Sequence, residues 1–168
     1  MVPNLDDVAA PSNISALFTI ASDNSGLVTI RPNGEGVTMY TVNFGDGSGD
    51  SEELRPGEEV SHVYDEGSYD VTIDAMNING EVTSYTQELM VSFRAPENLS
   101  VNVVPVPGDP FSSEVNAAAD LETFFEVDFG DSTDIEAFME GEVVRHTYAE
   151  VGEYILTVVA RSGGVAST

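Results

Sequence analysis

Apolar residues recur at every second position in short runs along the chain. The first run is Ile14, Ala16, Phe18 and Ile20, and the others fall at residues 40–44, 69–75, 85–91, 99–103, 125–129 and 154–160. A period of two is typical of a β-strand that buries one face. No window has the spacing of an amphipathic helix, so the pattern predicts an all-β fold.

Turn-forming residues separate these runs. They are SDNSG at residues 22–26, PNG at 32–34 and NG at 79–80. Short strands joined by such turns are typical of antiparallel β-sandwiches.

The sequence repeats itself at an offset of 85 residues. Residues 10–15 (APSNIS), 40–46 (YTVNFGD) and 67–69 (GSY) return as 95–100 (APENLS), 125–131 (FEVDFGD) and 152–154 (GEY), and 60–64 (VSHVY) returns at an offset of 84 as 144–148 (VRHTY). Two copies of one domain are therefore predicted. The expected division is a lead at residues 1–9, a first sandwich at 10–94 and a second sandwich at 95–168.

A complete second copy would run to about residue 179, which is 94 plus 85. The counterparts of residues 86–91 are therefore not in the sequence. We expect the second sandwich to lack its last strand and the chain to be a fragment of a longer polypeptide with neighbouring domains. An open sheet edge of this kind invites self-association or a strand from another chain.

Three motifs occur in the same order in both copies. The first copy has FGDG at residues 44–47, HVY at 62–64 and GSYDV at 67–71, and the second has FGDS at 129–132, HTY at 146–148 and GEYIL at 152–156. Together they resemble PKD domains, the immunoglobulin-like modules named for polycystic kidney disease proteins. The resemblance implies two tandem immunoglobulin-like β-sandwiches. Ser132 replaces the second turn glycine of the first copy, which argues against a positive φ at that residue.

Charge excludes one class of partner. Five basic residues face 30 acidic ones, which gives a net charge of −25, and the five are all arginine. Nucleic-acid binding requires a basic face, which this chain does not have. The lysine-free, acidic composition indicates either adaptation to high salt or engineering.

The absence of cysteine excludes disulfides, thiolate zinc sites and cysteine nucleophiles. No apolar run approaches the roughly 18 residues of a membrane-spanning helix, so no membrane span is predicted.

Acidic residues near the second FGD turn form the best candidate metal site. Asp128, Asp131 and Asp134 are spaced by three, and hard cations such as calcium bind several oxygen ligands from a flexible loop. The competing interpretation is that Asp131, like Asp46, accepts backbone N–H groups and fixes its own turn. Calcium is the one cofactor considered, and otherwise none is expected.

The two histidines, His62 and His146, occur once per copy on an alternating strand, which favours packing over a zinc site.

Three aromatic residues fall outside the core registers and are candidates for ligand binding. Phe124 points to the opposite face from Phe125, and Phe111 and Phe138 are expected in loops. Exposed rings can stack on sugars, whereas the alternative is a loop plug or a contact with a neighbouring module.

No nucleophile–base pair and no glycine-rich phosphate loop occurs in the sequence, so we expect no enzymatic activity. Residues 6–15, followed directly by two such modules, resemble the start of surface glycan-binding lipoproteins from bacterial polysaccharide-utilisation systems. That resemblance implies a non-catalytic spacer or binding segment at the bacterial cell surface, anchored in the outer membrane through the parent protein, which would bind a neutral polysaccharide. The alternatives are a structural module of an adhesin or surface layer, with or without calcium, and an accessory domain of a secreted hydrolase.

Overall fold

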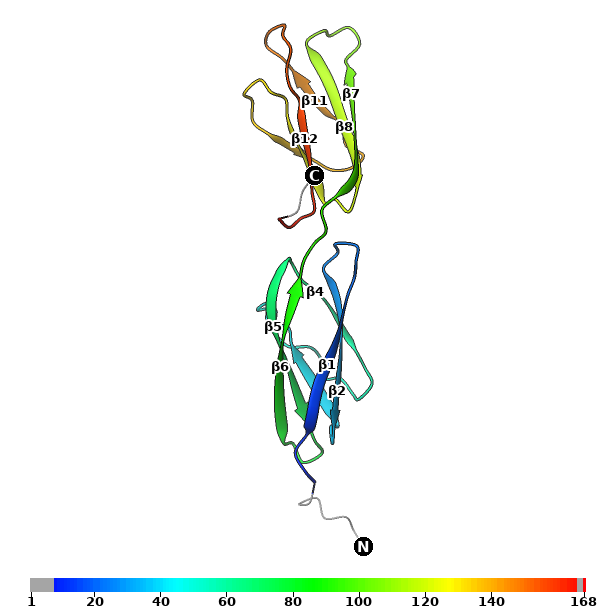
Figure 1. The fold of residues 1–168 in the computed structure, drawn as a ribbon, viewed down its shortest axis with the longest axis vertical. Coiled ribbons are helices and arrows are strands. Elements are labelled where there is room, and N and C mark those ends of the chain that lie inside the picture. Colours follow the sequence, from blue (N-terminus) through cyan, green and yellow to red (C-terminus); the bar gives the residue numbers. More distant parts are fainter. Residues whose placement is uncertain (1–7, 166–167) are drawn as a thin grey trace. The chain divides into compact units, whose positions relative to one another are not determined.

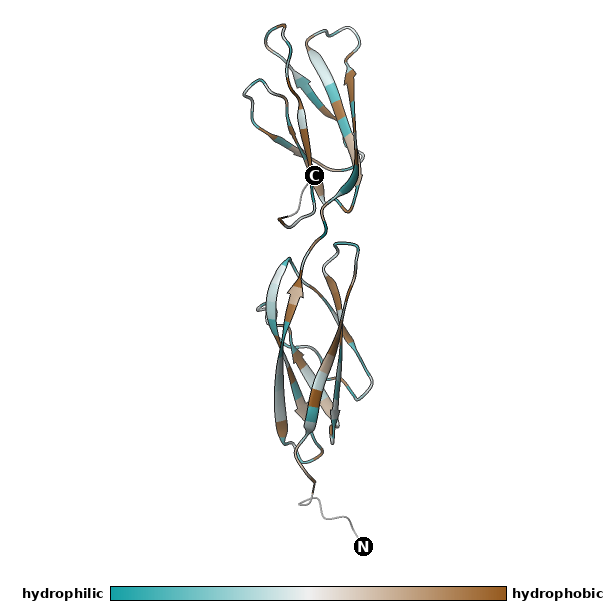
Figure 2. Ribbon diagram, viewed as in Figure 1, coloured by the Kyte–Doolittle hydropathy of each residue, from teal (hydrophilic) through white to brown (hydrophobic). Residues whose placement is uncertain are grey.

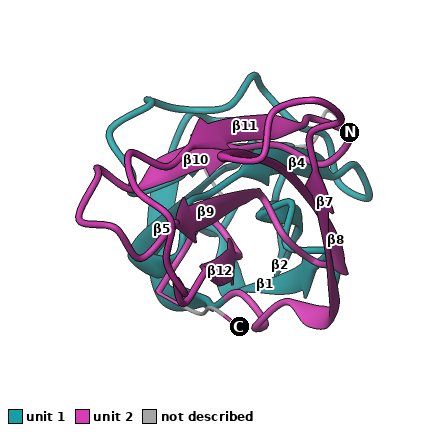
Figure 3. Ribbon diagram, turned by 90° about the horizontal axis from the view of Figure 1, so that it is seen from above, with its two compact units in different colours: residues 1–92 teal, residues 93–168 magenta. Residues whose placement is uncertain are grey.

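The computed structural model describes residues 8–165 and 168, and it is built from antiparallel β-strands (Figure 1). The chain divides into two compact units, residues 1–92 and 93–168, which are coloured separately in Figure 3. The boundary lies two residues before the one expected from the repeat. Among the described residues there is no helix that is long and apolar enough to cross a membrane.

Unit 1 contains two three-stranded antiparallel sheets. One has the order β1-β2-β4 and the other the order β3-β5-β6. Their strands are β1 (Ser12–Ile20), β2 (Leu27–Glu35), β3 (Met39–Asn43), β4 (Val60–Val63), β5 (Gly67–Met76) and β6 (Val82–Val91). The predicted all-β fold of tandem immunoglobulin-like sandwiches is thereby confirmed for the first copy.

The core of unit 1 lies between the two sheets. Val28 and Ile30 contribute from β2, Val42 from β3, and Val71 and Ile73 from β5, and all five are fully buried. Figure 2 shows hydrophobic and hydrophilic bands along these strands. Burial of apolar side chains at alternate positions is the main favourable contribution to folding here.

One predicted turn is wrong. Residues 32–34 (PNG) lie inside β2, where Pro32 is paired with Ala16 of β1. A central strand normally excludes proline because it lacks the N–H donor. Here β4 pairs only with the β2 residues from Leu27 to Ile30, so at Pro32 the strand has a neighbour on one side and the missing donor is tolerated.

Unit 2 has the same two layers, but among the described residues its second sheet has no counterpart of β6. Its sheets have the orders β11-β8-β7 and β10-β9-β12. The strands are β7 (Glu97–Pro105), β8 (Ser112–Asp120), β9 (Phe124–Asp128), β10 (Glu136–Phe138), β11 (Val144–Thr147) and β12 (Thr157–Arg161). The core is formed by Val115, Phe125, Val127, Phe129 and Phe138, with Ala117 and Ala160.

The short strand β10 corrects the expectation that Phe138 lies in a loop. Phe138 pairs with Phe125 on β9, just as Leu54 in unit 1 forms a β-bridge with Tyr40. Both side chains are buried, and Phe138 is only 4 % exposed. Three residues are too few to show an alternating pattern, which is why the sequence did not reveal this strand.

The strand expected at residues 154–160 begins only at Thr157. Its counterpart β5 pairs with β6 along its whole length, but with β3 only from Thr72 to Met76. Within the part of the chain that the structure describes, the first half of β5 therefore pairs with β6 alone. Residues 152–156 of unit 2 correspond to that half and form no strand pairing among the described residues.

Candidate functional site

The glycine of the FGD turn has the same role in both units. Gly45 and Gly130 have positive φ angles of 77° and 76°. A Cβ on Gly45 would lie 2.4 Å from the carbonyl oxygen of Asp70, and one on Gly130 would lie 2.4 Å from that of Ile155. Only glycine allows this close approach. It brings the turn at Gly45 against β5 in unit 1, and the turn at Gly130 against the segment just before β12 in unit 2.

The aspartate of each FGD turn holds its own turn with one oxygen. Asp46 Oδ1 accepts the backbone N–H of Ser48 at 2.9 Å and its hydroxyl at 2.5 Å. Asp131 Oδ1 accepts the same two groups of Thr133, at 3.2 Å and 2.6 Å. This is the geometry that the turn interpretation predicts.

Ser132 corrects one expectation about the second turn. Its φ is +69°, close to the +85° of its counterpart Gly47 in unit 1. The loss of the glycine therefore does not remove the positive φ at this position of the turn.

The second oxygen of each aspartate makes a contact that the sequence did not reveal. Asp46 Oδ2 lies 2.6 Å from His62 Nε2, and Asp131 Oδ2 lies 2.7 Å from His146 Nε2. The partners are 15 or 16 residues apart, which no local motif predicts. The sequence did contain a signal for this contact, because the aspartate and the histidine both recur in the second copy, at offsets of 85 and 84 residues.

Each histidine also packs against aromatic rings. The His62 ring stacks on Phe44, with the centroids 4.0 Å apart and the planes 6° from parallel, and His146 stacks on Phe129 at 4.1 Å and 12°. The edge of the following tyrosine completes each cluster. The histidines therefore pack within their strands, as the sequence indicated.

The tyrosine hydroxyls of these clusters donate to backbone carbonyl groups. Tyr64 Oη donates to the carbonyl of Phe44 at 3.1 Å, and Tyr148 Oη donates to that of Phe129 at 3.3 Å. Burial raises the pKa of Tyr64 above its ordinary value. These hydroxyl groups thus serve as fixed donors and not as acids.

Hydrogen bonds keep both turn aspartates ionised. The Ser48 hydroxyl, followed by the His62 ring, holds the pKa of Asp46 well below its usual 3.8. The Thr133 hydroxyl has the largest effect on Asp131 and, with a further contribution from the His146 ring, lowers its pKa to about 2 although desolvation opposes the shift. Donors that bind the charged form favour ionisation.

A serine, a histidine and an aspartate, the residue types of a catalytic triad, meet in unit 1 as Ser48, His62 and Asp46, but their arrangement differs from that of a triad. The Ser48 hydroxyl lies 2.5 Å from Asp46 Oδ1 and 3.4 Å from His62 Nε2, the same nitrogen that contacts Asp46. In a triad the histidine stands between the two and accepts the serine proton. Here the hydroxyl proton is directed to the carboxylate, so the arrangement holds the turn.

The three calcium candidates have separate surroundings. Asp128 Oδ1 accepts the N–H of Gly130 at 2.8 Å, Asp131 contacts Thr133 and His146, and Asp134 is exposed. Over residues 8–165 and 168, no three His, Asp or Glu side chains form a group that could hold a metal ion. Calcium binding by Asp128, Asp131 and Asp134 stays a prediction.

The three ligand-binding candidates differ in accessibility. Phe138 packs on Phe125 in the core, with the ring centroids 5.2 Å apart, so it is closed to a ligand. Phe124 is half-buried at the start of β9, opposite Arg161. Phe111 is 40 % exposed in the turn before β8. The structure does not bring these rings together on one surface.

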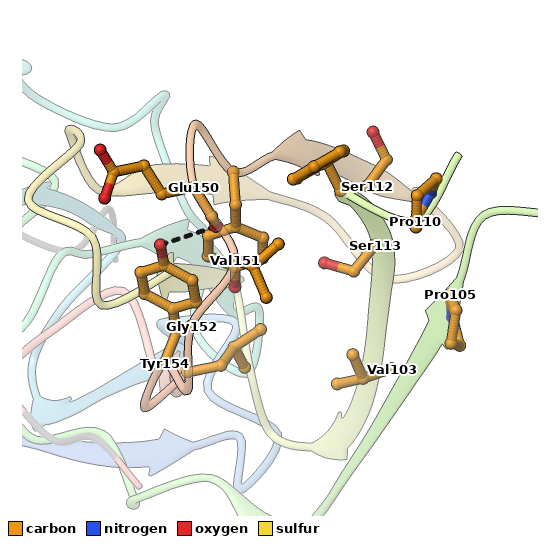
Figure 4. Close-up of a pocket in the computed structure, with 12 residues that line it drawn as sticks. Val103, Pro105, Pro110, Ser112, Ser113, Glu150, Val151, Gly152 and Tyr154 are labelled. Carbon is orange, nitrogen blue, oxygen red and sulfur yellow. Dashed lines mark hydrogen bonds between the residues drawn. The ribbon is translucent and has the colours of Figure 1, made fainter.

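Phe111 instead lines a cavity of about 420 Å³ in unit 2 (Figure 4). Its lining includes Val103 and Pro105 of β7, together with Tyr148, Tyr154 and Leu156 from the chain after β11. The Tyr154 hydroxyl donates to the carbonyl of Glu150, the contact drawn dashed in Figure 4. Most of the lining is apolar or backbone.

Comparisons with known proteins gave a family match. The family model described as PKD domain matches residues 4–93. A solved structure from work on the promiscuous specificity of carbohydrate-binding modules of the β-sandwich superfamily covers 92 % of this chain and 85 % of its own, at 14 % identity and a TM-score of 0.38. The search of curated proteins gave no match.

Proposed function

The chain belongs to the PKD domain family, and from this premise we propose that it is a non-catalytic extracellular spacer in a bacterial cell-surface glycan-binding protein. In this role the two sandwiches hold neighbouring domains of the parent protein apart. The parent protein would carry the outer-membrane anchor and the main affinity for a neutral polysaccharide.

The observation that supports this proposal is the repeated Asp–His cluster. Both units use an aspartate, a histidine and a tyrosine of the same motifs to hold a turn against a strand. The groups most suited to acid–base chemistry are thus engaged in internal contacts that are the same in each copy. A set of internal contacts that has the same structural role in both copies fits a structural module.

The charge and the aromatic residues support a neutral ligand for the parent protein. A net charge of −25 repels anionic glycans such as alginate. Affinity for sugars rests largely on exposed flat rings, and the sequence contains no tryptophan. Phe111 and Phe124 are the remaining candidate rings for a weak contact.

Affinity electrophoresis and calorimetry with a neutral glucan and mannan test the spacer assignment. We expect weak or undetectable binding and no hydrolysis of either polysaccharide. Clear binding that is lost in Phe111→Ala or Phe124→Ala, but kept in a control with the exposed Leu17→Ala, would make these units the glycan readers. Turnover of a polysaccharide or peptide that is abolished by Asp46→Ala or Asp131→Ala would show an enzyme instead.

A second candidate is a self-associating structural module of an adhesin or surface layer. The observation that favours it is the edge of unit 2, where Val101 and Val103 of β7 are exposed. Light scattering over a range of concentrations separates the two functions. A constant monomer mass supports the spacer, and a mass that rises with concentration supports the adhesin.

A further inference from the structure

The motif that opens each copy contains a sequon for N-glycosylation. Residues 13–15 (NIS) and 98–100 (NLS) both have the pattern Asn-x-Ser with x other than proline. After every other asparagine of the sequence, the residue two positions later is neither serine nor threonine. Such a pattern is an acceptor for an N-linked glycan only where its asparagine is accessible on an exported protein. The surroundings of Asn13 and Asn98 therefore decide whether the pattern has chemical meaning.

Both asparagines lie in a β-bulge at the start of a strand. The pairing of β1 with β2 shifts between Ser12 and Ser15, and that of β7 with β8 shifts between Glu97 and Ser100. In each case two residues of the first strand stand opposite one residue of the second. A bulge interrupts the ladder locally. Among the described residues, β1 and β7 are also the outermost strands of their sheets, so each sequon lies at an open edge.

The backbone of the bulge explains the asparagine but not the serine. Asn13 and Asn98 are exposed and have φ angles of 52° and 56°. Asparagine tolerates this left-handed conformation better than most residues, so the bulge alone accounts for its presence. Ser15 and Ser100 are exposed strand residues, and neither hydroxyl makes a hydrogen bond within the described part of the chain. Their recurrence is required by a sequon and by nothing in the packing.

The middle residue of each sequon fixes the bulge to the sandwich. Ile14 covers Gly34, where a Cβ would lie 2.6 Å from Ile14 Cδ1. Leu99 packs against the core of unit 2. The asparagine before this residue and the serine after it are exposed in both units. A glycan on the asparagine would therefore extend into solvent and leave the core contacts in place.

Asn98 makes one contact that a glycan has to respect. Its Nδ2 donates to Asp120 Oδ2 at 2.7 Å. An amide nitrogen carries two hydrogens, and attachment of a sugar replaces one of them. The remaining N–H still reaches Asp120, so the contact is compatible with a glycan at Asn98.

We propose that Asn13 and Asn98 are acceptors for N-linked glycans, one in each unit. The proposal rests on the extracellular location in the proposed function, because sequons are used in exported proteins. The donor is an oligosaccharide carried on a polyprenyl phosphate or diphosphate. The bond between C1 of its first sugar and the phosphate oxygen breaks, and a bond between C1 and Nδ2 forms. The amide proton and the lipid phosphate are released.

Secretion of the full chain from a eukaryotic host tests both sites, because this host supplies export and the transfer enzyme whatever the natural location. We expect intact mass spectrometry to find two glycans on the parent chain, one on Ser15→Ala, one on Ser100→Ala and none on the double variant. These variants keep both asparagines and hence the bulges. Asn102→Gln is the matched control, since Asn102 is an exposed asparagine of β7 outside a sequon, and it should keep both glycans.

The unfolding temperature tests the fit of the glycans to the fold. The glycosylated parent should unfold no more than about 5 °C below the unglycosylated double variant, because both acceptors stand clear of the core. A larger loss would overturn the proposal, since the folded bulges would then have no room for a sugar. A secreted parent chain that lacks a glycan at Asn13 or Asn98, or a glycan that survives the serine substitutions, would overturn it as well. Polysaccharide binding tests the spacer function separately, so failure of one proposal is distinguishable from failure of the other.

Discussion

Asp46 and His62 join the two sheets of unit 1, with Asp46 Oδ2 lying 2.6 Å from His62 Nε2. Asp46 follows β3 of one sheet, and His62 lies on β4 of the other. Asp131 and His146 make the same connection in unit 2, between the turn after β9 and strand β11. In each sandwich the aspartate–histidine contact therefore links the two layers at the end where the FGD turn lies.

This contact predicts a loss of stability in acid. The pKa of Asp46 is held below 3.8 in the folded state, and that of Asp131 is lowered to about 2. A carboxyl group whose folded pKa is depressed adds stability above its unfolded pKa, and the contribution is lost as the pH falls through the folded pKa. The double variant Asp46→Asn, Asp131→Asn should therefore unfold at a lower temperature than the parent at pH 6, with the difference shrinking from about pH 4 to pH 2.

The control accounts for the general effect of charge. Protonation of 30 acidic side chains relieves the net repulsion, so the unfolding temperature of any single variant changes with pH for that reason as well. Asp65→Asn with Asp134→Asn removes the same charge from two exposed positions, one in each unit. A difference from the parent that stays constant from pH 6 to pH 2 in the first double variant would refute the prediction.

The FGD glycines are expected to tolerate no side chain. Gly45→Ala places a Cβ against the carbonyl of Asp70 and keeps a positive φ, so the turn must move away from its neighbour. We expect a loss of about 3 kcal/mol or more in the free energy of unfolding, measured in urea. Gly47→Ala is the matched control, because its φ is +85° and no atom lies within 4 Å. It should cost about 1 to 2 kcal/mol, and equal losses would contradict the close approach.

Phe138 is expected to act on stability and not on binding. Phe138→Ala removes a ring that is 4 % exposed and stacked on Phe125, which typically costs about 3 to 5 kcal/mol in a packed core. Phe111→Ala, at a ring 40 % exposed, should cost about 1 kcal/mol or less. Urea unfolding followed by hydrogen exchange assigns the loss to unit 2. Similar values for the two variants would mean that Phe138 is not part of the core.

Salt should stabilise the protein chiefly by screening. Sodium chloride weakens the repulsion that accompanies a net charge of −25, so the unfolding temperature should rise with ionic strength. Calcium chloride at matched ionic strength should add only a slight further increase, because a large one requires an ion well above its dissociation constant. A large calcium-specific rise that disappears in Asp134→Asn, which leaves the turn contacts of Asp131 intact, would establish a metal site.

Much of the fold was predictable from alternation and from the repeat. The runs beginning at Ile14, Tyr69 and Tyr85 lie in β1, β5 and β6, and the offset of 85 residues correctly placed β7 and β9 of unit 2 as the counterparts of β1 and β3. Pro32 misled the prediction, because a proline inside a paired strand is tolerated only where one neighbour is missing. β10 was missed because a strand of three residues has no period to detect.

Less of the candidate site was predictable. The turn contacts of Asp46 are local, and the glycine before it indicated them. The contact with His62 depends on how two sheets pack, which a single sequence does not encode in any short motif. The strand expected to begin at Tyr154 shows a second limit of prediction from sequence. Residues 154–156 alternate as a strand would, but a strand also needs a neighbouring strand to pair with, and β12 is paired only from Thr157.

The ladder between β5 and β6 has a mechanical consequence for a spacer. In unit 1 the chain enters through β1 and leaves through β6, and Figure 1 shows both strands running toward the same end of that unit. Antiparallel hydrogen bonds stand perpendicular to the strands. A pulling force on Val91 along β6 therefore loads the ten residue pairs with β5 in shear, all at once, instead of peeling them apart one by one.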